Sequence, residues 1–171
     1  MKIGALKETS LGERRVALTP DSAVQLQKLG YDCLVEKNSG LAAGFSDEQY
    51  KSVGVEIVDT PKKLTEACDV IVKVLPPSES ELQELSSSKT LISLFYPGSN
   101  EALLLLAKSS ESNVIAMDMV PRISRAQKMD VLSSMANISG YRAVIEAGNN
   151  FGRFFTGQMT AAGKVPPAKV L

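Results

Sequence analysis

The chain has 171 residues, 44% hydrophobic and 22% charged, so it is long enough for one well-filled domain and too short for two ordinary ones. Lysine and arginine (19) balance aspartate and glutamate (19), which leaves no basic field to attract nucleic acid. The absence of histidine removes the Ser-His and Cys-His nucleophile pairs and nearly all zinc sites, so no metal site is predicted. If the chain takes part in chemistry, other groups must move the protons, or none move.

No apolar run approaches the roughly 20 residues needed to span a bilayer. The amino terminus reads as a strand rather than a leader peptide, so we expect a soluble chain. Cys33 falls in a predicted strand and Cys68 near a predicted helix end. We therefore expect two buried thiols rather than a disulfide.

Strands and helices are predicted to alternate along the first 119 residues. The predicted strands are residues 2–6, 32–36, 55–58, 69–74, 90–95 and 114–119. Helix starts are marked by a cap followed by proline, or by a capping box, at Thr19-Pro20, Ser46-x-x-Gln49, Thr60-Pro61 and Ser78-x-x-Glu81. A near-continuous apolar run at 69–74 is typical of a strand buried on both faces of a parallel sheet. This pattern predicts an α/β fold with a doubly wound, mostly parallel sheet. The predicted fold is flavodoxin-like or Rossmann-like, but no G-x-G-x-x-G dinucleotide fingerprint occurs in the chain.

Ligands of such sheets bind beyond the carboxyl ends of the strands. Four polar or charged side chains follow or end predicted strands, namely Arg15, Lys73, Tyr96 and Arg122. Their common edge is the candidate site.

The stretch 120–141 (VPRISRAQKMDVLSSMANISGY) concentrates polar groups in one passage from turn to helix. Pro121 ends the preceding strand, and a loop precedes a helix predicted from about residue 128. The apolar face of this helix is Val131, Met135, Ile138 and Ile145, and its polar stripe is Asp130, Ser133, Ser134, Asn137 and Tyr141. A solvated face is the ordinary explanation of such a stripe. Serine and asparagine compete with helix formation, however, so their presence beside two arginines favours a neutral polar or anionic ligand.

Four segments of the sequence are similar to those of a known protein family. They are KETSLGERRVALTP, VIVKVLPP, MDMVPRISRAQKMDVLSSMANISGYRAVIEA and FGRFFTGQMTAAGKVPPAKVL. Together they resemble the amino-terminal domain of the NAD(H)-binding (alpha) component of proton-translocating NAD(P)+ transhydrogenases, over essentially the whole chain. The RVALTP segment is shared with the related alanine dehydrogenases and discriminates less.

The resemblance implies roles for four residues. Arg122 would hold the nicotinamide end of NAD(H), with Ser133 beside it. Gln127 would reach toward NADP(H) on the partner component, and Asp130 would organise the loop. Hydride would pass directly between the two nicotinamides, so positioning supplies most of the catalysis and no general acid is required.

The resemblance also implies an architecture. In this family the glycine-rich turn that binds NAD follows the VPPAKVL strand, in a Rossmann domain. Residues 1–142 would be the amino-terminal α/β domain, and 143–171 the connecting helices and entry strand to that Rossmann domain. Three phenylalanines in 151–155 suggest a short helix, and 168–171 begins like a strand. The complete subunit would be a homodimer that binds an NADP(H) component and a membrane proton channel, with this domain on the cytoplasmic or matrix side.

Two alternatives stay open. In alanine dehydrogenases the substrate-binding arginine and lysine would correspond to Arg15 and Lys73, but the catalytic histidine would fall at or next to Tyr96. Tyrosine, with an ordinary pKa near 10, is a poor proton donor at neutral pH. Arg15 and Lys73 could equally be structural and pair with acids such as Glu8 and Glu13. The other alternative is a non-catalytic α/β interaction module.

Overall fold

The computed structural model describes residues 1–85 and 88–170. The chain forms two compact units, Met1–Met129 and Asp130–Leu171. The first unit holds a six-stranded sheet and the second holds a long helix and a hairpin.

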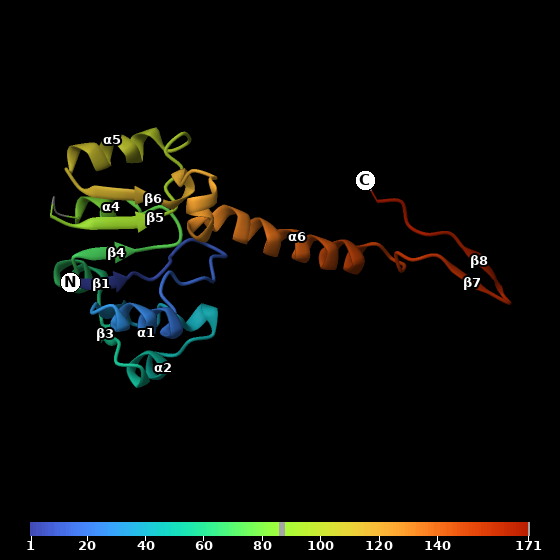
Figure 1. Cartoon of the computed structure of the whole chain (residues 1–171), viewed down its shortest axis with the longest axis horizontal. Coiled ribbons are helices and arrows are strands. Elements are labelled where there is room, and N and C mark those ends of the chain that lie inside the picture. Colours follow the sequence, from blue (N-terminus) through green and yellow to red (C-terminus); the bar gives the residue numbers. More distant parts are fainter. Residues whose placement is uncertain (86–87, 171) are drawn as a thin grey trace. The chain divides into compact units, whose positions relative to one another are not determined.

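The sheet of the first unit is parallel throughout, in the order β3-β2-β1-β4-β5-β6 (Figure 1). Its strands are β1 (Lys2–Ala5), β2 (Asp32–Glu36), β3 (Glu56–Val58), β4 (Val70–Val72), β5 (Thr90–Ser93) and β6 (Asn113–Ala116). The doubly wound fold is therefore confirmed. The strand order reverses between β1 and β4, which is where such sheets offer a crevice for ligands.

Helices connect the strands, and the predicted capping signals mark the starts of α1, α2, α3 and α4. They are α1 (Pro20–Lys28), α2 (Asp47–Ser52), α3 (Pro61–Ala67), α4 (Glu79–Gln83) and α5 (Glu101–Ser109), with a short 3₁₀ helix η1 (Leu41–Ala43). The N-cap side chains that accept a backbone N–H are those of Thr19, Ser46, Thr60 and Ser78. After α1, Gly30 has φ of 87°, the left-handed conformation that ends helices and that glycine adopts without strain.

Two apolar clusters hold the unit together. One cluster joins β-strand residues such as Ile71 and Leu91 to α3, α4 and α5. The other joins β1 and β2 to α1 and to the fully buried Tyr50, whose hydroxyl donates to the Leu18 carbonyl at 2.7 Å. Cys33 and Cys68 are free and buried, as expected, and burial raises the pKa of the Cys68 thiol to about 11.

β1 ends one residue earlier than predicted, and β4, β5 and β6 end two or three residues earlier, where carboxylates or a 3₁₀ turn take over from the sheet ladder. After β4, the N–H of Val74 donates to Glu8 Oε1 at 2.6 Å. After β5, the N–H groups of Phe95 and Tyr96 donate to the Asp118 carboxylate. After β6, the predicted continuation to residue 119 is the 3₁₀ helix η2 (Met117–Met119).

The second unit consists of α6 (Val131–Asn150) and an antiparallel hairpin of β7 (Gln158–Thr160) and β8 (Gly163–Val165). The short helix predicted around 151–155 is wrong, since Gly152 at φ of 76° follows the C-cap Phe151 and ends the helix. Instead the Phe151 and Phe155 rings pack with centroids 5.4 Å apart. Residues 168–170 form no strand, and the last residue of that prediction, Leu171, lies outside the described residues. Within the part of the chain that the structure describes, no helix has the length and apolar character to cross a membrane.

Candidate functional site

Glu8 links the two strands on either side of the switch point. Its carboxylate follows β1, accepts the Val74 N–H after β4, and lies 3.9 Å from the Lys73 ammonium. The side chains of Glu8 and Lys73 are only 3% and 2% exposed. Burial raises the pKa of Glu8 above its ordinary value, although the hydrogen bond from Val74 and the charge of Lys73 act in the opposite direction.

Lys73 also ties the edge of the sheet to α4. Its Nζ donates to Glu81 Oε1 at 2.8 Å, while Glu81 Oε2 accepts the Ser78 N–H at 2.7 Å as part of the capping box. The ammonium is therefore engaged by two carboxylates inside the domain. Of the two interpretations that the sequence left open for Lys73, the structure shows the pairing with nearby acids.

Arg15 is held by Glu13 through both ends of its guanidinium. Nε donates to Oε1 at 2.9 Å and Nη2 to Oε2 at 2.7 Å, and the Arg15 backbone N–H donates to Oε1 at 2.8 Å. The hydrogen bond from Arg15 lowers the pKa of Glu13 and raises that of Arg15. Glu8 and Arg15 line one cavity and Glu8 pairs with Lys73, so these three residues lie at one edge of the sheet. Tyr96 follows β5, which runs parallel to β4, so it lies beyond the carboxyl ends of the same strands.

The pairing of Arg15 with Glu13 predicts a pH-dependent contribution to stability. A carboxyl whose folded pKa is depressed stabilises the fold above its unfolded pKa, near 4.5, and loses that contribution as pH falls through the folded value. Arg15 is 42% exposed, so we expect Arg15→Ala to cost about 1 kcal/mol or less at pH 7. Urea unfolding at pH 7 and pH 3 checks this, with Arg14→Ala as control. An Arg15→Ala difference that does not shrink in acid would contradict the assignment.

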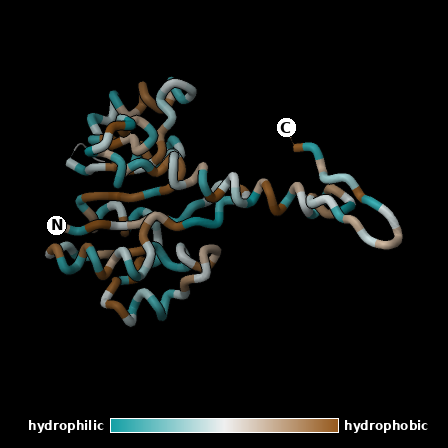
Figure 2. Tube along the Cα trace, turned by 45° about the vertical axis from the view of Figure 1, so that its right-hand side comes forward, coloured by the Kyte–Doolittle hydropathy of each residue, from teal (hydrophilic) through white to brown (hydrophobic). Residues whose placement is uncertain are grey.

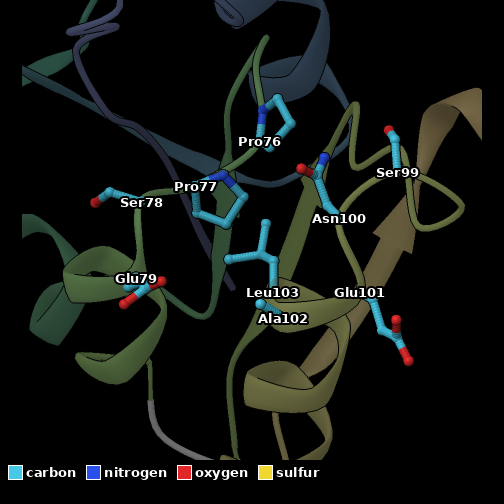
Figure 3. Close-up of a pocket in the computed structure, with 9 residues that line it drawn as sticks. All are labelled: Pro76, Pro77, Ser78, Glu79, Ser99, Asn100, Glu101, Ala102 and Leu103. Atoms are coloured by element: carbon cyan, nitrogen blue, oxygen red, sulfur yellow. The ribbon is translucent and has the colours of Figure 1, made fainter.

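A cavity of about 250 Å³ opens beside this cluster, between the loops that follow β1 and β2. Its lining residues are Lys7, Glu8, Glu13, Arg15, Asn38, Ser39, Leu41 and Ala42. A second cavity, of about 390 Å³, lies between the first turns of α4 and α5. In Figure 3, Glu79 and Glu101 lie on its opposite sides, with Pro77 and Leu103 between them. The sequence predicted no site there.

Asp118 is a residue of this edge that the sequence reasoning missed. Its Oδ1 accepts the Phe95 N–H at 2.7 Å and its Oδ2 accepts the Tyr96 N–H at 3.0 Å. Tyr96 has φ of 50°, a conformation unusual for a residue with a Cβ, and the two hydrogen bonds help to hold it. The available signal was an acid near the carboxyl end of the sixth predicted strand, 114–119, close to the edge where ligands bind.

Arg122 and Gln127 lie in the last segment of the first unit. Gln127 belongs to the 3₁₀ helix η3 (Ser124–Met129), which Ala126 anchors because it is 5% exposed. Both Arg122 and Gln127 are exposed. Among the described residues no hydrogen bond or ion pair engages their side chains, so their donors can reach a ligand.

Asp130 and Ser133 lie in the second unit, at the start of α6. Asp130 is the N-cap: its Oδ1 accepts the Ser133 N–H at 2.9 Å and its Oδ2 accepts the Ser133 hydroxyl at 2.6 Å. The Ser133 hydroxyl proton is thus used internally, whereas its oxygen keeps acceptor capacity. Arg122 and Gln127 therefore belong to the first unit, and Asp130 and Ser133 belong to the second.

The predicted apolar face of α6 is half-buried only near the start of the helix, at Val131 and Met135. Tyr141 on the polar stripe is 71% exposed, and Ile138 and Ile145 on the apolar face are 56% and 40% exposed. Hydrophobic positions recur along the helix (Figure 2). None of the described residues in either stripe is fully buried, and the ligand expected for the polar stripe stays a prediction.

Comparison with known proteins identifies the family. The family model described as "Alanine dehydrogenase/PNT, N-terminal domain" matches residues 4–139. The chain belongs to this family.

Among relatives, the chain is 64% identical over all 171 residues to the NAD(P) transhydrogenase subunit alpha of Cereibacter sphaeroides, of which it covers 33%. It is 33% identical over 145 residues to alanine dehydrogenase 1 of Staphylococcus aureus (strain Mu50), covering 85% of this chain and 38% of that protein. A crystal structure of transhydrogenase from Sinorhizobium meliloti matches 98% of this chain and 50% of its own, with a TM-score of 0.90 and 38% identity. The chain thus spans a third to half of these proteins.

Proposed function

We propose that the chain is the amino-terminal part of an NAD(P) transhydrogenase alpha subunit, and that it positions the nicotinamide of NAD(H) for direct hydride transfer to NADP+, coupled in the complete enzyme to proton translocation. The observation that carries this proposal is the 64% identity over all 171 residues to the Cereibacter sphaeroides subunit. Its partners would be an NADP(H)-binding component and a membrane proton-channel component, and the complete subunit would be a homodimer.

Arg122 and Gln127 are suited to hold two different nucleotides. The Arg122 guanidinium carries only donors and would hold the carboxamide oxygen at the nicotinamide end of NAD(H). The Gln127 amide both donates and accepts, and would contact the NADP(H) nucleotide of the partner component. The exposure of both side chains supports these roles.

The capping geometry of α6 supports complementary roles for Asp130 and Ser133. Because the Ser133 hydroxyl donates to Asp130 at 2.6 Å, its oxygen faces a ligand as an acceptor, which suits a carboxamide NH₂. Asp130 fixes that orientation and the first turn of the helix. Asp130 is thus a positioning residue for Ser133.

Direct transfer explains why a chain without histidine can contribute to this reaction. The hydride carries the electron pair from NADH to NADP+, giving NAD+ and NADPH, so no proton is gained or lost. The residues of this chain therefore need to bind and align, and alignment alone can contribute several kcal/mol to lowering a barrier.

An alanine dehydrogenase activity has less support. That function needs a proton donor and free cationic groups for a small carboxylic acid. Here Lys73 is engaged by Glu8 and Glu81, and Tyr96 stands where the resemblance puts the histidine. The relative named for that activity is 33% identical, against 64% for the transhydrogenase subunit.

We expect the isolated chain to bind NADH weakly or not at all, because it has no glycine-rich turn to cradle the pyrophosphate. Titration of NADH fluorescence with the 171-residue chain measures this. The control is the same chain fused to the residues that follow the matched third of the Cereibacter sphaeroides subunit. Micromolar binding by the isolated chain would contradict the need for a second domain, and a fusion that binds NADH but transfers no hydride with its partner component would contradict the proposed function.

A further inference from the structure

The segment 117–126 carries Arg122 away from the end of β6, and few contacts hold it. It begins with η2, continues through Pro121 and enters η3, where Ala126 is the one buried residue of the segment. Among the described residues no hydrogen bond or ion pair engages the Arg122 side chain. The backbone on either side of Arg122 therefore decides where its guanidinium can reach.

Asp118 anchors the first end of this segment to the neighbouring strand. Its Oδ1 accepts the N–H of Phe95 at 2.7 Å and its Oδ2 accepts the N–H of Tyr96 at 3.0 Å, directly after β5. Hydrogen bonds to a charged carboxylate are stronger than those between neutral groups, and two of them from one side chain fix its orientation as well as its position. Figure 1 shows β5 and β6 side by side, so the carboxylate bridges two adjacent strands where both have ended.

The turn that Asp118 contacts is itself rigid. The Tyr96 carbonyl accepts the N–H groups of Ser99 and Asn100, both at 3.0 Å, and Asn100 Nδ2 donates to the Phe95 carbonyl at 3.0 Å. Tyr96 has φ of 50°, and such an uncommon backbone conformation persists only where the surroundings over-determine it. The carboxylate is therefore bonded to a fixed point.

The sheet does not depend on these two hydrogen bonds. β6 is already paired with β5 along Asn113–Ala116, before the chain reaches Asp118. Loss of the carboxylate would therefore leave the parallel ladder intact and release only the residues that follow it.

The chain from Asp118 to Arg122 is short and stiff. Only residues 119–121 separate the two, and Pro121 has a fixed φ and keeps the residue before it out of the helical region. Val120 is accordingly extended, with φ of −61° and ψ of 123°. A displacement of Asp118 is thus transmitted to Arg122 instead of being absorbed between them.

We propose that Asp118 is a positioning residue for Arg122. Its two hydrogen bonds to the turn after β5 set the place at which the guanidinium meets the nicotinamide end of NAD(H). The inference rests on the proposed role of Arg122 and goes beyond it by naming the group that places this arginine. Asp118 itself contacts neither nucleotide, so its effect is on the alignment of the rings and not on the affinity for NADH.

A double-mutant cycle in the assembled enzyme tests this inference, with the rate of hydride transfer from NADH to NADP+ over a single turnover as the readout. The variants are Asp118→Asn, Arg122→Ala and the two together. Asparagine keeps the shape of the side chain but turns an NH₂ toward one of the two N–H groups, so one hydrogen bond is lost. Asp69→Asn is the matched control, because Asp69 also accepts a backbone N–H, that of Lys2 at 2.7 Å, at the amino end of β1 and β4.

We expect Asp118→Asn to slow transfer about tenfold while the KM for NADH changes by less than about twofold, and Asp69→Asn to keep the wild-type rate. Because Asp118 acts through Arg122, adding Asp118→Asn to Arg122→Ala should slow transfer no further. Thermal unfolding shows which variants are folded. If Asp118→Asn is unfolded, Asp118→Glu, which keeps the carboxylate but displaces it, takes its place in the cycle with the same expectation for the double variant.

Two results would overturn this inference and leave the role of Arg122 standing. One is a wild-type rate in the folded Asp118 variant, and the other is a double variant in which the two losses multiply. A wild-type rate in Arg122→Ala alone would contradict the proposed role of Arg122, and this inference with it.

Discussion

Replacing Gln127 with alanine should slow hydride transfer from NADH to NADP+ in the assembled enzyme by about tenfold or more, because misalignment of the two rings directly raises the barrier. The Gln127 side chain is exposed, and no hydrogen bond to a described residue holds it, so the loss should come from the reaction rather than from folding. We expect kcat to fall while the KM for NADH changes little. Steady-state kinetics at saturating NADP+ measures both.

Lys128→Ala is the matched control, since Lys128 is the exposed neighbour of Gln127 in η3. It should retain the wild-type rate, and thermal unfolding should show both variants folded. Full activity in Gln127→Ala would favour the non-catalytic interaction module.

Replacing Lys73 with methionine should lower the free energy of unfolding by about 3–5 kcal/mol, because it leaves the buried Glu8 carboxylate without its cation. The side chains of Lys73 and Glu8 are 2% and 3% exposed, so water can hydrate the unpaired Glu8 carboxylate only slightly. The folded pKa of Glu8, already raised by burial, should rise further. A carboxyl with a raised folded pKa destabilises the fold at high pH and ceases to do so as pH falls. The deficit should therefore shrink in acid.

Urea unfolding of the chain at pH 7 and pH 5 measures this deficit. Lys37→Met is the control, because Lys37 pairs with Asp59 at 3.9 Å with both side chains more than half exposed, and it should change stability by less than about 1 kcal/mol. Adding Glu8→Gln to Lys73→Met should recover part of the loss at pH 7. A Lys73→Met loss no larger than that of the control would show that the buried pair is not needed for the fold.

The fold could be predicted because its signals are local. A cap followed by proline at Thr19-Pro20 and a capping box at Ser46-x-x-Gln49 set helix starts that tertiary packing then keeps. The strand ends could not be predicted in the same way. The Val74 N–H leaves the ladder for a glutamate 66 residues earlier in the chain, and no periodicity reports such a contact.

In the candidate site, too, the positions of residues along the chain were predictable, whereas their long-range contacts were not. The rule that ligands bind at strand carboxyl ends placed Arg15, Lys73, Tyr96 and Arg122 at one edge. The structure brings the first three to the ends of neighbouring strands, and the place of Arg122 at that edge stays a prediction. Their partners were harder to predict, because Glu81 reaches Lys73 from a capping box and Asp118 reaches the Tyr96 N–H from the 3₁₀ helix η2 that follows β6. The exposed α6 shows a further limit, since sequence periodicity reports an apolar stripe but not what packs against it.

The central claim is that this chain positions the two nicotinamides and supplies no acid or base. Following an isotope from NADH to NADP+ tests this claim directly. The assembled enzyme is given NADP+ and NADH deuterated at the transferred position of C4, and the NADPH formed is examined by mass spectrometry over a single turnover. We expect the deuterium to arrive undiluted by solvent hydrogen, and Gln127→Ala to slow its arrival about tenfold without diluting it. Solvent hydrogen at C4 of NADPH, or an unchanged rate in Gln127→Ala, would contradict the proposal.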